Sequence, residues 1–380
     1  MKHAFRYPCT GHVDHRGFGQ FLEEELGPSR SNLKKFASEL SERFGPQHVT
    51  LVNSGSSANL AAAAALAEAT GPGMHAVTAG FTFPTTLSSL LHAGFRVTVA
   101  DTEQHGFGLD PTALLKALRP ETRVICITHF LGFPANLAAI MAIAKSHNLL
   151  VLQDACETMN LVVEGQPAHQ HGTLTTWSFY HPHHLTTYGG GAILSTNGDW
   201  QARLESLTHW GRACTCHYAP EHCPAPEGMD HFFSYVRTGF NLEMSELNAC
   251  FGRFQLQQWT EHEQRRRRYY DLLYQATSDL PGIRVYPAPT GSGTPFVFPV
   301  TCLDRPLGGV ASKLLAAGVE IRNLVGGVVT RHDAYAHLDH DGLESTTRMS
   351  ERSFMVGMHQ TLKASDIEEV AGILRAALAK

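Results

Sequence analysis

The sequence lacks the features that would place it in a membrane or on a nucleic acid. No apolar run approaches the roughly 20 residues that a membrane-spanning helix needs, and no long basic stretch marks a nucleic-acid surface. The run from Arg265 to Arg268 lies in a helical pattern, where a solvated or interface face is the better interpretation. The first residues, MKHAFRYPCTGH, lack the apolar core of a signal peptide. We therefore expect a cytoplasmic protein that binds neither membranes nor nucleic acids.

Strong charge, internal repeats and low-complexity segments are also missing. The net charge of the 380 residues is −5, which is typical of a globular protein long enough for two domains. The eight cysteines do not indicate a disulfide framework in a cytoplasmic enzyme. Three of them nevertheless fall within CTCHYAPEHC, a local density typical of metal sites.

Lysine is missing from the whole central part of the chain, between Lys145 and Lys313. This excludes a lysine Schiff base from that part. Within it lies SFYHPHHLTTYGGGAIL, residues 178–194, where a triple glycine follows closely on three histidines. The number of histidines alone decides nothing, so the question is which residue one of them replaces.

Strand-like and helix-like segments alternate through the first two thirds of the chain. Segments such as HAVTAG, RVICITHF and LLVLQDA are near-continuous apolar strands, and helical segments separate them. The pattern predicts a parallel sheet with both faces covered. A long polar helix is expected from about Ser245 to Tyr274, and the pattern then changes to a smaller α+β unit. We expect an N-terminal arm and large domain over 1–275 and a small C-terminal domain over 276–380.

Loops at the carboxyl ends of these strands carry the candidate site, because ligands of open parallel sheets bind there. In NSGSSAN, Gly55 permits a tight turn, and Ser56 and Ser57 offer an anion site at a helix N-terminus; a plain serine N-cap is an equal alternative. Asp154 ends a buried strand, where it would need a positive partner such as a protonated pyridine nitrogen; a structural aspartate is equally favoured. Phe83 could stack on a flat ring, although core packing is favoured in isolation.

The order of SGSSAN, FTFPTT, QDACE, WSFYHPHHLTTYGGGAI and GFNLEMSELNA resembles the sugar aminotransferase family of pyridoxal-phosphate (PLP) enzymes. The resemblance runs from about Gly27 to the C-terminus. It implies the α/β fold-type I architecture and a homodimer with shared active sites. It assigns the cofactor phosphate to Ser56, Ser57 and Ser178, with Gly55 in the same loop. Asp154 would pair with the pyridine nitrogen, Phe83 would stack on the ring, and Glu157 would lie near the ring hydroxyl. Asn241 would reach the cofactor phosphate of the neighbouring subunit.

The sequence departs from this family at one position. Counted from Ser178, His183 stands where the aminotransferases carry their catalytic lysine. The cofactor would then be held non-covalently, as pyridoxamine phosphate (PMP). An imidazole with a pKa near 6.5 suits removal of a proton from the cofactor C4′ atom. This is the pattern of sugar 3-dehydrases, which remove the C3 hydroxyl of nucleotide-linked 4-keto-6-deoxy sugars. His181 and His184 are weaker candidates for substrate contacts, with loop polarity as an equal alternative.

The cysteines resemble those of one branch of these dehydrases, the iron–sulfur enzymes acting on CDP-linked 4-keto-6-deoxyglucose. Cys156 follows Asp154 by two residues, and 57 residues separate it from Cys214 (214 − 156 − 1). From the residues alone, zinc and iron–sulfur are equal alternatives. With the histidine motif, the resemblance favours a [2Fe–2S] cluster and an electron-donating reductase. The four proposed ligands are Cys156, Cys214, Cys216 and Cys223.

Alternatives remain at the level of function. Arg322 and Arg331, in GVEIRNLVGGVVTRHDAY, could bind substrate phosphates, and ordinary surface pairing is an equal alternative. A cluster-free dehydratase using PMP and glutamate, or an enzyme closer to the sugar aminotransferases, is the enzymatic rival. A non-catalytic regulator on this fold is disfavoured because Asp154, Ser178 and Asn241 are present.

Overall fold

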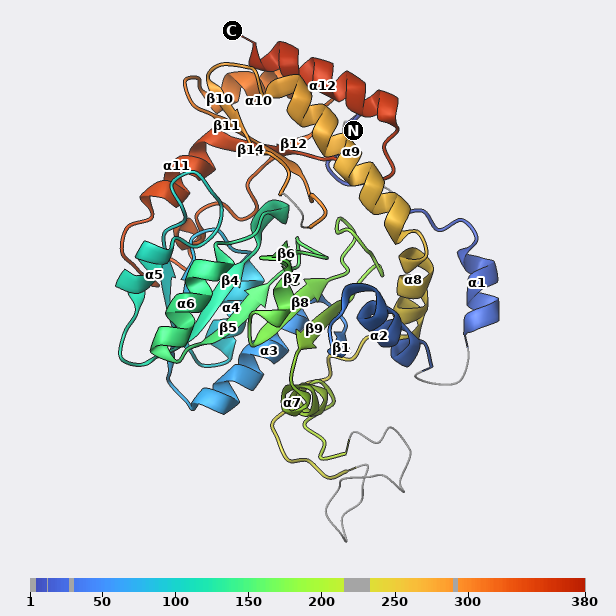
Figure 1. Ribbon diagram of the computed structural model, residues 1–380, viewed down its shortest axis with the longest axis vertical. Coiled ribbons are helices and arrows are strands. Elements are labelled where there is room, and N and C mark those ends of the chain that lie inside the picture. Colours follow the sequence, from blue (N-terminus) through green and yellow to red (C-terminus); the bar gives the residue numbers. More distant parts are fainter. Residues whose placement is uncertain (1–4, 12, 27–30, 215–232, 290–292, 380) are drawn as a thin grey trace.

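A large, mainly parallel sheet forms the centre of the molecule. The computed structural model describes residues 5–11, 13–26, 31–214, 233–289 and 293–379. Eight strands follow the order β1-β9-β8-β5-β4-β2-β3-β13 (Figure 1). In this described part, the sheet is mainly parallel, as predicted. Only β9 departs from this, because it is antiparallel to both of its neighbours. The strands are β1 His48–Val52, β2 His75–Ala79, β3 Arg96–Ala100, β4 Thr122–Thr128, β5 Leu150–Asp154, β8 Leu174–Ser178, β9 Gly191–Ser195 and β13 Asp339–His340.

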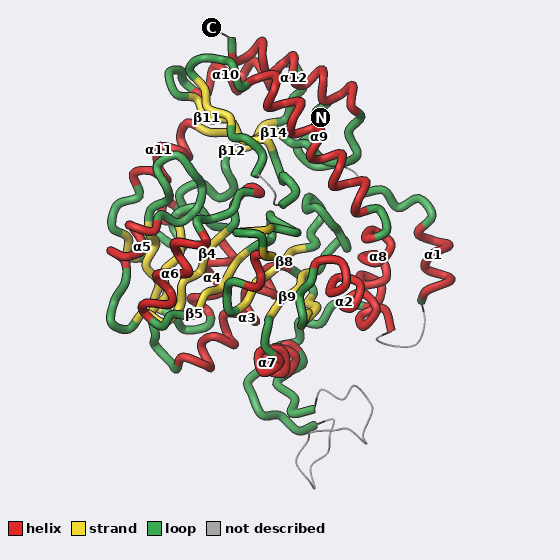
Figure 2. Tube along the Cα trace, in the orientation of Figure 1, coloured by secondary structure: helices red, strands yellow, loops and turns green. Residues whose placement is uncertain are grey.

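Helices cover both faces of this sheet (Figure 2). Within β4, Val124 and Cys126 pack with α3, α4 and α7, whereas Ile125 and Ile127 pack with α5 and α6. Successive residues of a strand point to opposite faces, so a strand covered on both sides is expected to be a near-continuous apolar run. The helices are α2 Ser31–Phe44, α3 Gly55–Thr70, α4 Pro84–His92, α5 Pro111–Ala117, α6 Leu137–His147 and α7 Gly198–Thr208.

A second, antiparallel sheet of order β10-β11-β14-β12 packs with α9, α10 and α12 around a separate apolar core. The C-terminal part also supplies β13, which returns to the edge of the large sheet. The expected domain boundary at 275 falls in the last turn of α9, and the division stays a prediction. The elements are β10 Ile283–Val285, β11 Phe298–Cys302, β12 Ile321–Asn323, β14 Ser353–Val356, α10 Leu307–Ala316, α11 Glu344–Arg352 and α12 Ala364–Leu378; the hairpin β6 Val162–Val163 and β7 Gln166–Pro167 lies apart.

The single long helix expected from Ser245 to Tyr274 is wrong. Two helices occupy this segment, α8 Glu246–Leu256 and α9 Trp259–Thr277, and they meet at Gln257 and Gln258. Figure 1 shows α9 running from the small sheet towards α8. The sequence between them has no proline or glycine, so tertiary packing rather than a local helix breaker divides the pattern.

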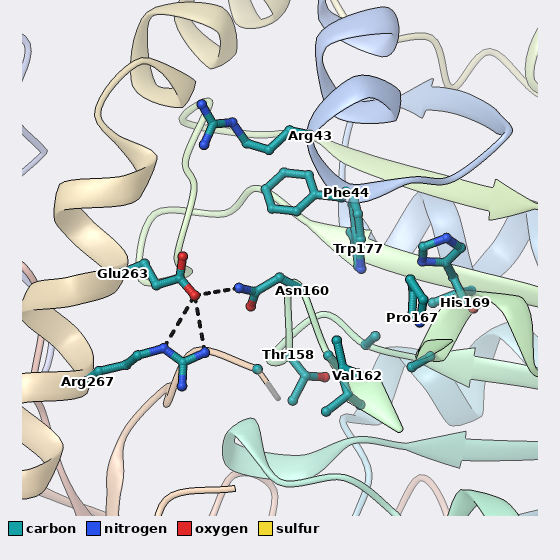
Figure 3. Close-up of a pocket in the computed structure, with 15 residues that line it drawn as sticks. Arg43, Phe44, Thr158, Asn160, Val162, Pro167, His169, Trp177, Glu263 and Arg267 are labelled. Carbon is teal, nitrogen blue, oxygen red and sulfur yellow. Dashed lines mark hydrogen bonds and ion pairs between the residues drawn. The ribbon is translucent and has the colours of Figure 1, made fainter. Parts of the chain in front are cut away.

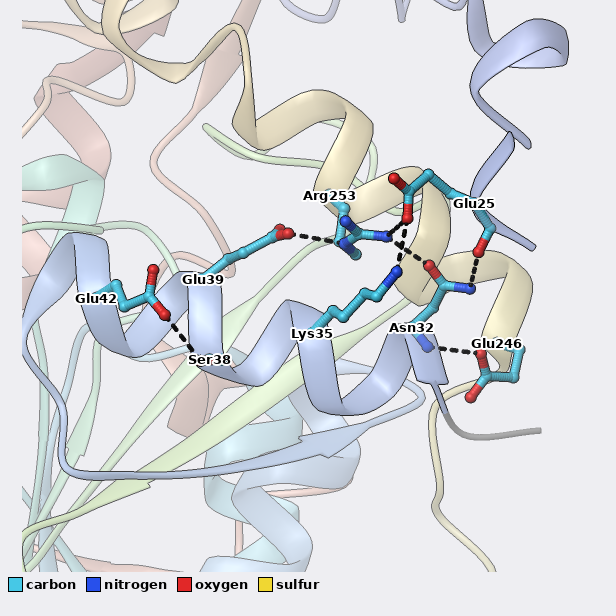
Figure 4. Close-up of polar contacts among 8 residues, drawn as sticks. All are labelled: Glu25, Asn32, Lys35, Ser38, Glu39, Glu42, Glu246 and Arg253. Atoms are coloured by element: carbon cyan, nitrogen blue, oxygen red, sulfur yellow. Dashed lines mark hydrogen bonds and ion pairs between the residues drawn. The ribbon is translucent and has the colours of Figure 1, made fainter. Parts of the chain in front are cut away.

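Arg253 of α8 joins the N-terminal helices to the body (Figure 4). Its guanidinium bonds Glu25 of α1 (Phe18–Glu25) at 2.7 Å and Glu39 of α2 at 2.8 Å. It also donates to the Asn32 side chain at 2.9 Å. Because Arg253 is almost fully buried, these acids compensate a charge that would otherwise be costly.

No helix in the described ranges is both long and apolar enough to cross a membrane.

Candidate active site

A cavity of about 560 Å³ lies beyond the carboxyl ends of β1, β5 and β8, where the ligand site was expected. The predicted site residues that line it are Gly55, Ser56, Phe83, Asp154, Cys156, Glu157, Ser178, His183 and Arg322. Ser57, His181, His184, Cys214, Asn241 and Arg331 are not among the residues that line it.

The loop after β1 brings α3 against Ser178. Ser54 is the N-cap of α3, and its hydroxyl accepts a hydrogen bond from the Ser57 backbone N–H at 3.0 Å. A side chain at Gly55 would place its Cβ 2.6 Å from the Ser178 Cβ, so glycine is required for this approach. The Ser57 hydroxyl donates to Asn53, whereas Ser56 faces the cavity. The hydroxyls and the free N–H groups of the helix therefore form an anion-binding arrangement.

Asp154 is buried, and neutral donors hold its carboxylate. Its Oδ2 accepts from the Asn59 amide at 3.0 Å and from the Thr86 hydroxyl, and its Oδ1 accepts from the Cys156 backbone N–H at 3.1 Å. Among the described residues, no lysine, arginine or histidine forms an ion pair with it. A buried carboxylate without a cationic partner suits a ligand that brings a protonated nitrogen.

Glu157 and Phe83 contribute an acid and an aromatic face to the cavity. Glu157 accepts a 2.6 Å hydrogen bond from the Leu131 backbone N–H, yet its burial raises the pKa of the carboxyl group to about 8. Phe83 is 48% exposed, so it does not lie in the core, which is where a phenylalanine considered in isolation was expected. Its exposed face is available to a flat ring.

His183 lines the cavity and stacks on Phe296. The two ring centroids are 5.2 Å apart with an interplanar angle of 17°. Its Nδ1 atom is buried without a hydrogen-bond partner among the described residues. Burial first, and then the charge of Arg266, lower the pKa of His183 to about 3. The pKa of His183 therefore lies below the ordinary imidazole value of 6.5, and the imidazole is neutral at physiological pH.

The neighbouring histidines have different surroundings. His184 is buried, and its Nε2 donates to the Thr294 carbonyl at 2.8 Å, which fixes the loop to the segment before β11. Burial lowers the pKa of His184 well below its ordinary value. His181 is partly exposed. Neither ring is placed as His183 is, in the wall of the cavity.

The two predicted phosphate-binding arginines differ. Arg322 lines the cavity, while its guanidinium pairs with Glu320 at 3.0 Å. Arg331 pairs with Glu351 at 2.9 Å on the surface. Asn241 is exposed, its backbone forms a β-bridge with His209, and it does not line the cavity.

Of the four predicted cluster ligands, the structure describes two. Cys156 lines the cavity, and burial followed by the Asp154 charge raises the pKa of its thiol well above the ordinary value. Cys214 does not line the cavity; it lies next to Ala213, whose backbone N–H donates to the Ser234 carbonyl oxygen. Cys216 and Cys223 lie outside the described residues. Within the ranges that are described, no three His, Cys, Asp or Glu side chains form a metal-binding group.

Several residues of the site were not predicted. Asn59 and Thr86 hold Asp154, and both lie in motifs that were recognised, SGSSAN and FTFPTT. The signal was their spacing: each follows a strand by a few residues, on a helix that starts at the cavity. Cys9 and Thr10 of the N-terminal arm also line the cavity, and no local pattern indicated this.

A second cavity, of about 330 Å³, lies beside β8 (Figure 3). Alternation along β8 separates the two, because Thr175 and Trp177 face this cavity and Ser178 faces the other. Figure 3 shows Glu263 bonded to Asn160 and Arg267 on one wall, with His169 on the opposite wall. The His169 Nε2 and Thr175 Oγ1 atoms are buried and have no hydrogen-bond partner among the described residues.

Comparison with known proteins identifies the family. The model of the DegT/DnrJ/EryC1/StrS aminotransferase family matches residues 16–375. The chain belongs to this family. As a DegT/DnrJ/EryC1/StrS protein it is an enzyme of the PLP-dependent sugar aminotransferase and dehydratase group, and the predicted recognition and fold class are confirmed.

Relatives of this DegT/DnrJ/EryC1/StrS protein include named dehydratases. It is 30% identical over 373 residues to dTDP-4-dehydro-2,6-dideoxy-D-glucose 3-dehydratase of Saccharopolyspora spinosa, with 92% of this chain and 80% of the relative covered. It is 25% identical to GDP-4-keto-6-deoxy-D-mannose 3-dehydratase of Yersinia pseudotuberculosis, with 94% of each covered. The E. coli GDP-4-keto-6-deoxy-D-mannose-3-dehydratase, solved with hydrated PLP, has a TM-score of 0.88 at 22% identity, covering 98% of this chain and 100% of that one.

Proposed function

We propose that this protein is a PMP-dependent 3-dehydrase that removes the C3 hydroxyl of a nucleotide-linked 4-keto-6-deoxy sugar. The observation that carries the proposal is His183 in the cavity wall, at the position where the family's aminotransferases carry lysine. No lysine is among the residues that line the cavity in the described part of the chain. Transamination through a lysine Schiff base is thereby disfavoured, and proton transfer by an imidazole is favoured.

The residues present fit PMP or PLP. Asp154 would pair with the ring nitrogen, Phe83 would stack on the ring, and Glu157 would face the ring hydroxyl. The phosphate would lie at Gly55, Ser56 and Ser178, and the Ser57 hydroxyl, which donates to Asn53 in this structure, would turn to contact it. When bound, PMP supplies an amine that condenses with a ketone and a ring that accepts electrons. Because the Asp154 carboxylate has only neutral donors around it, a protonated ring nitrogen would compensate its charge.

His183 would accept the proton from C4′ of the cofactor as the C3 hydroxyl leaves. Its neutral state keeps a ring lone pair free for this purpose. Arg322 would contact a substrate phosphate from the cavity wall, a role that would require it to turn from Glu320. His181, His184 and Arg331, which do not line the cavity, are weaker candidates for the same substrate. The names of the relatives support a nucleotide sugar as the substrate class.

A homodimer with shared sites is part of the proposal. Asn241 would bind the cofactor phosphate of the neighbouring subunit, which agrees with its exposed position away from its own cavity.

The source of electrons is a separate proposal. The spacing of Cys156, Cys214, Cys216 and Cys223 supports a [2Fe–2S] cluster reduced by a partner reductase, with a Cys₄ zinc site as the alternative. The test is to purify the protein anaerobically and assay iron, acid-labile sulfide and zinc. Stoichiometric zinc without iron would exclude the electron-transfer half of the proposal.

One observation favours a second candidate, a cluster-free dehydratase that regenerates PMP from glutamate. A structural relative of this chain, GDP-4-keto-6-deoxymannose-3-dehydratase, has been solved with a trapped PLP–glutamate geminal diamine. Turnover with glutamate and no reductase would support this candidate over the cluster-bearing one.

The dehydration itself is tested with protein loaded with PMP and a panel of dTDP-, GDP- and CDP-linked 4-keto-6-deoxy sugars. We expect release of a product that lacks the C3 hydroxyl, and exchange of the C4′ proton in D₂O. The variant His183→Asn should retain PMP but lose both reactions. Undiminished exchange in this variant would assign the base to another residue, and no turnover by the native protein would favour a non-catalytic role.

A further inference from the structure

One arginine of the run Arg265 to Arg268 does not face solvent. Arg266 is only 2% exposed, whereas its three neighbours keep contact with solvent. Arg265 and Arg267 pair with acids one turn earlier on α9, as expected of a solvated helix face. Arg266 therefore needs an explanation that the sequence pattern does not provide.

The contacts of Arg266 are neutral. Its Nη1 donates to the carbonyl oxygens of Phe296 at 3.0 Å and Pro295 at 3.4 Å, and its Nε donates to the Gln360 side chain at 3.0 Å. No carboxylate in the described ranges forms an ion pair with it. Burial lowers the pKa of Arg266 to about 10, so it remains positively charged at neutral pH. A buried charge without an opposite partner is costly, and proteins keep such groups mainly where they have a function.

The segment that Arg266 holds is the wall on which the histidines rest. The backbone carbonyl of Phe296 accepts from Arg266, and the ring of the same residue stacks on His183. The carbonyl of Thr294 accepts from His184. Arg266 and His183 also line the same cavity. A single segment, residues 294–296, thus links α9 to the histidine loop.

We propose that Arg266 is a positioning residue for His183: it holds the 294–296 segment against the imidazole and sets a positive charge beside it that opposes formation of an imidazolium. The proposal rests on the proposed function, in which His183 accepts the C4′ proton. The proton would pass from C4′ to His183 and then to the departing C3 oxygen, which leaves as water. A nearby guanidinium favours the second transfer, because it makes the imidazolium a stronger acid.

The electrostatic surroundings support this role. After burial, the charge of Arg266 is the next largest cause that lowers the pKa of both His183 and His184; His183 also lowers the pKa of His184. Other ionisable groups surround His183. On its own loop these are Tyr180, His181 and His184, and around the cavity they are Cys9, Asp154, Cys156, Glu157, Arg322 and His359. The carboxyl groups of Asp154 and Glu157 are not among the causes that shift the pKa of His183, whereas the charge of Arg266 is.

The test compares Arg266→Met with Arg266→Lys and with the control Arg268→Met, which removes an exposed arginine from the same helix. The first readout is the titration of His183 by NMR in PMP-loaded protein carrying ¹³C-labelled histidine, with His183→Asn used to assign its signal. We expect the His183 titration to move up by about one pH unit or more in Arg266→Met. It should move little in Arg266→Lys and not at all in Arg268→Met.

The second readout is the pH profile of turnover. In Arg266→Met the acidic limb of kcat should move up by a similar amount, because more of His183 is protonated at a given pH. A purely structural role would lower kcat evenly and leave both titrations unchanged, and that result would overturn the proposal. If Arg266→Met does not fold, Arg266→Gln replaces it, and an unshifted His183 titration in Arg266→Gln would also overturn the proposal. The NMR titration does not depend on turnover, so it separates this proposal from the proposed function, which His183→Asn tests.

Discussion

His183 is informative because a single side chain distinguishes two chemistries on one fold. Its ring stacks on Phe296 and meets the ring of Tyr180 edge-on. A lysine at this position would start from the same backbone and enter the same cavity. The position therefore allows a direct test of whether the rest of the site is still that of an aminotransferase.

We expect His183→Lys to bind PLP covalently. The new amine would reach the cofactor aldehyde, because the family places its Schiff-base lysine at this position. The measurement is mass spectrometry after borohydride reduction, which should show one PLP attached to residue 183. His183→Asn is the matched control and should show none. Absence of the adduct in His183→Lys would mean that the cofactor lies elsewhere in the cavity.

Glu157 makes stability depend on pH. Because burial raises its pKa to about 8, the folded state keeps the proton that the unfolded state loses near pH 4.5. Its contribution to stability is thus complete below about pH 4.5 and is lost as the pH rises to about 8. We expect the loss to be on the order of 5 kcal/mol in the apoprotein, because the two pKa values differ by about 3.5 (8 − 4.5) and each pH unit is about 1.4 kcal/mol.

The measurement is the free energy of unfolding in urea at several pH values between 4.5 and 8.5. The variant Glu157→Gln, which is neutral throughout, should lack this decline. Parallel curves for the two proteins would show that Glu157 is ionised in the folded state.

At the scale of elements, the two faces of β8 separate two environments. The Thr176 hydroxyl donates to Asn59, which holds Asp154, whereas Thr175 faces the second cavity and its hydroxyl has no partner in the part of the chain that the structure describes. Adjacent threonines in one strand thus form a matched pair, one with a hydrogen bond and one without.

We expect Thr175→Val to stabilise the protein by about 1 kcal/mol, because it replaces an unpaired buried hydroxyl by a methyl group of similar size. The control Thr176→Val should destabilise it by about 1–2 kcal/mol, because it leaves the Asn59 amide oxygen without its donor. Urea unfolding measures both. Destabilisation by Thr175→Val would indicate that ordered water in the cavity bonds this hydroxyl.

The sequence predicted where the helices and strands lie better than it predicted how they pair and pack with one another. Apolar strands such as RVICIT were found because burial on both faces leaves no polar positions. The reversed direction of β9 was not predictable, since strand direction depends on pairing with β1 and β8 rather than on its own residues. The break between α8 and α9 and the burial of Arg266 likewise depend on tertiary contacts. Of the site, the motifs located Asp154 and His183, whereas Arg266 had no local signal.

At the scale of the whole molecule, the expected dimer implies sites that two chains share. Asn241 lies outside its own cavity, and His183 lies within it. If Asn241 serves the neighbouring subunit, variants at the two positions affect different sites of a mixed dimer.

We expect His183→Asn and Asn241→Ala to be inactive or nearly so separately, and to recover activity when refolded together. A mixed dimer has one site with both native residues, so random mixing should restore about a quarter of native activity. The measurement is turnover after co-refolding, and the control is the same mixture without refolding. No recovery, with mixed dimers demonstrated by differential tags, would place Asn241 in the site of its own chain.

The strand β13 has a consequence for synthesis of the protein. It pairs with β3 at the edge of the large sheet, although some 240 residues separate the two strands (339 − 98 = 241 at the first pair). While the ribosome is still making the small sheet, the edge of β3 remains open and can pair with other chains. Nascent chains that stall before residue 339 should therefore depend on chaperones more than the finished protein does.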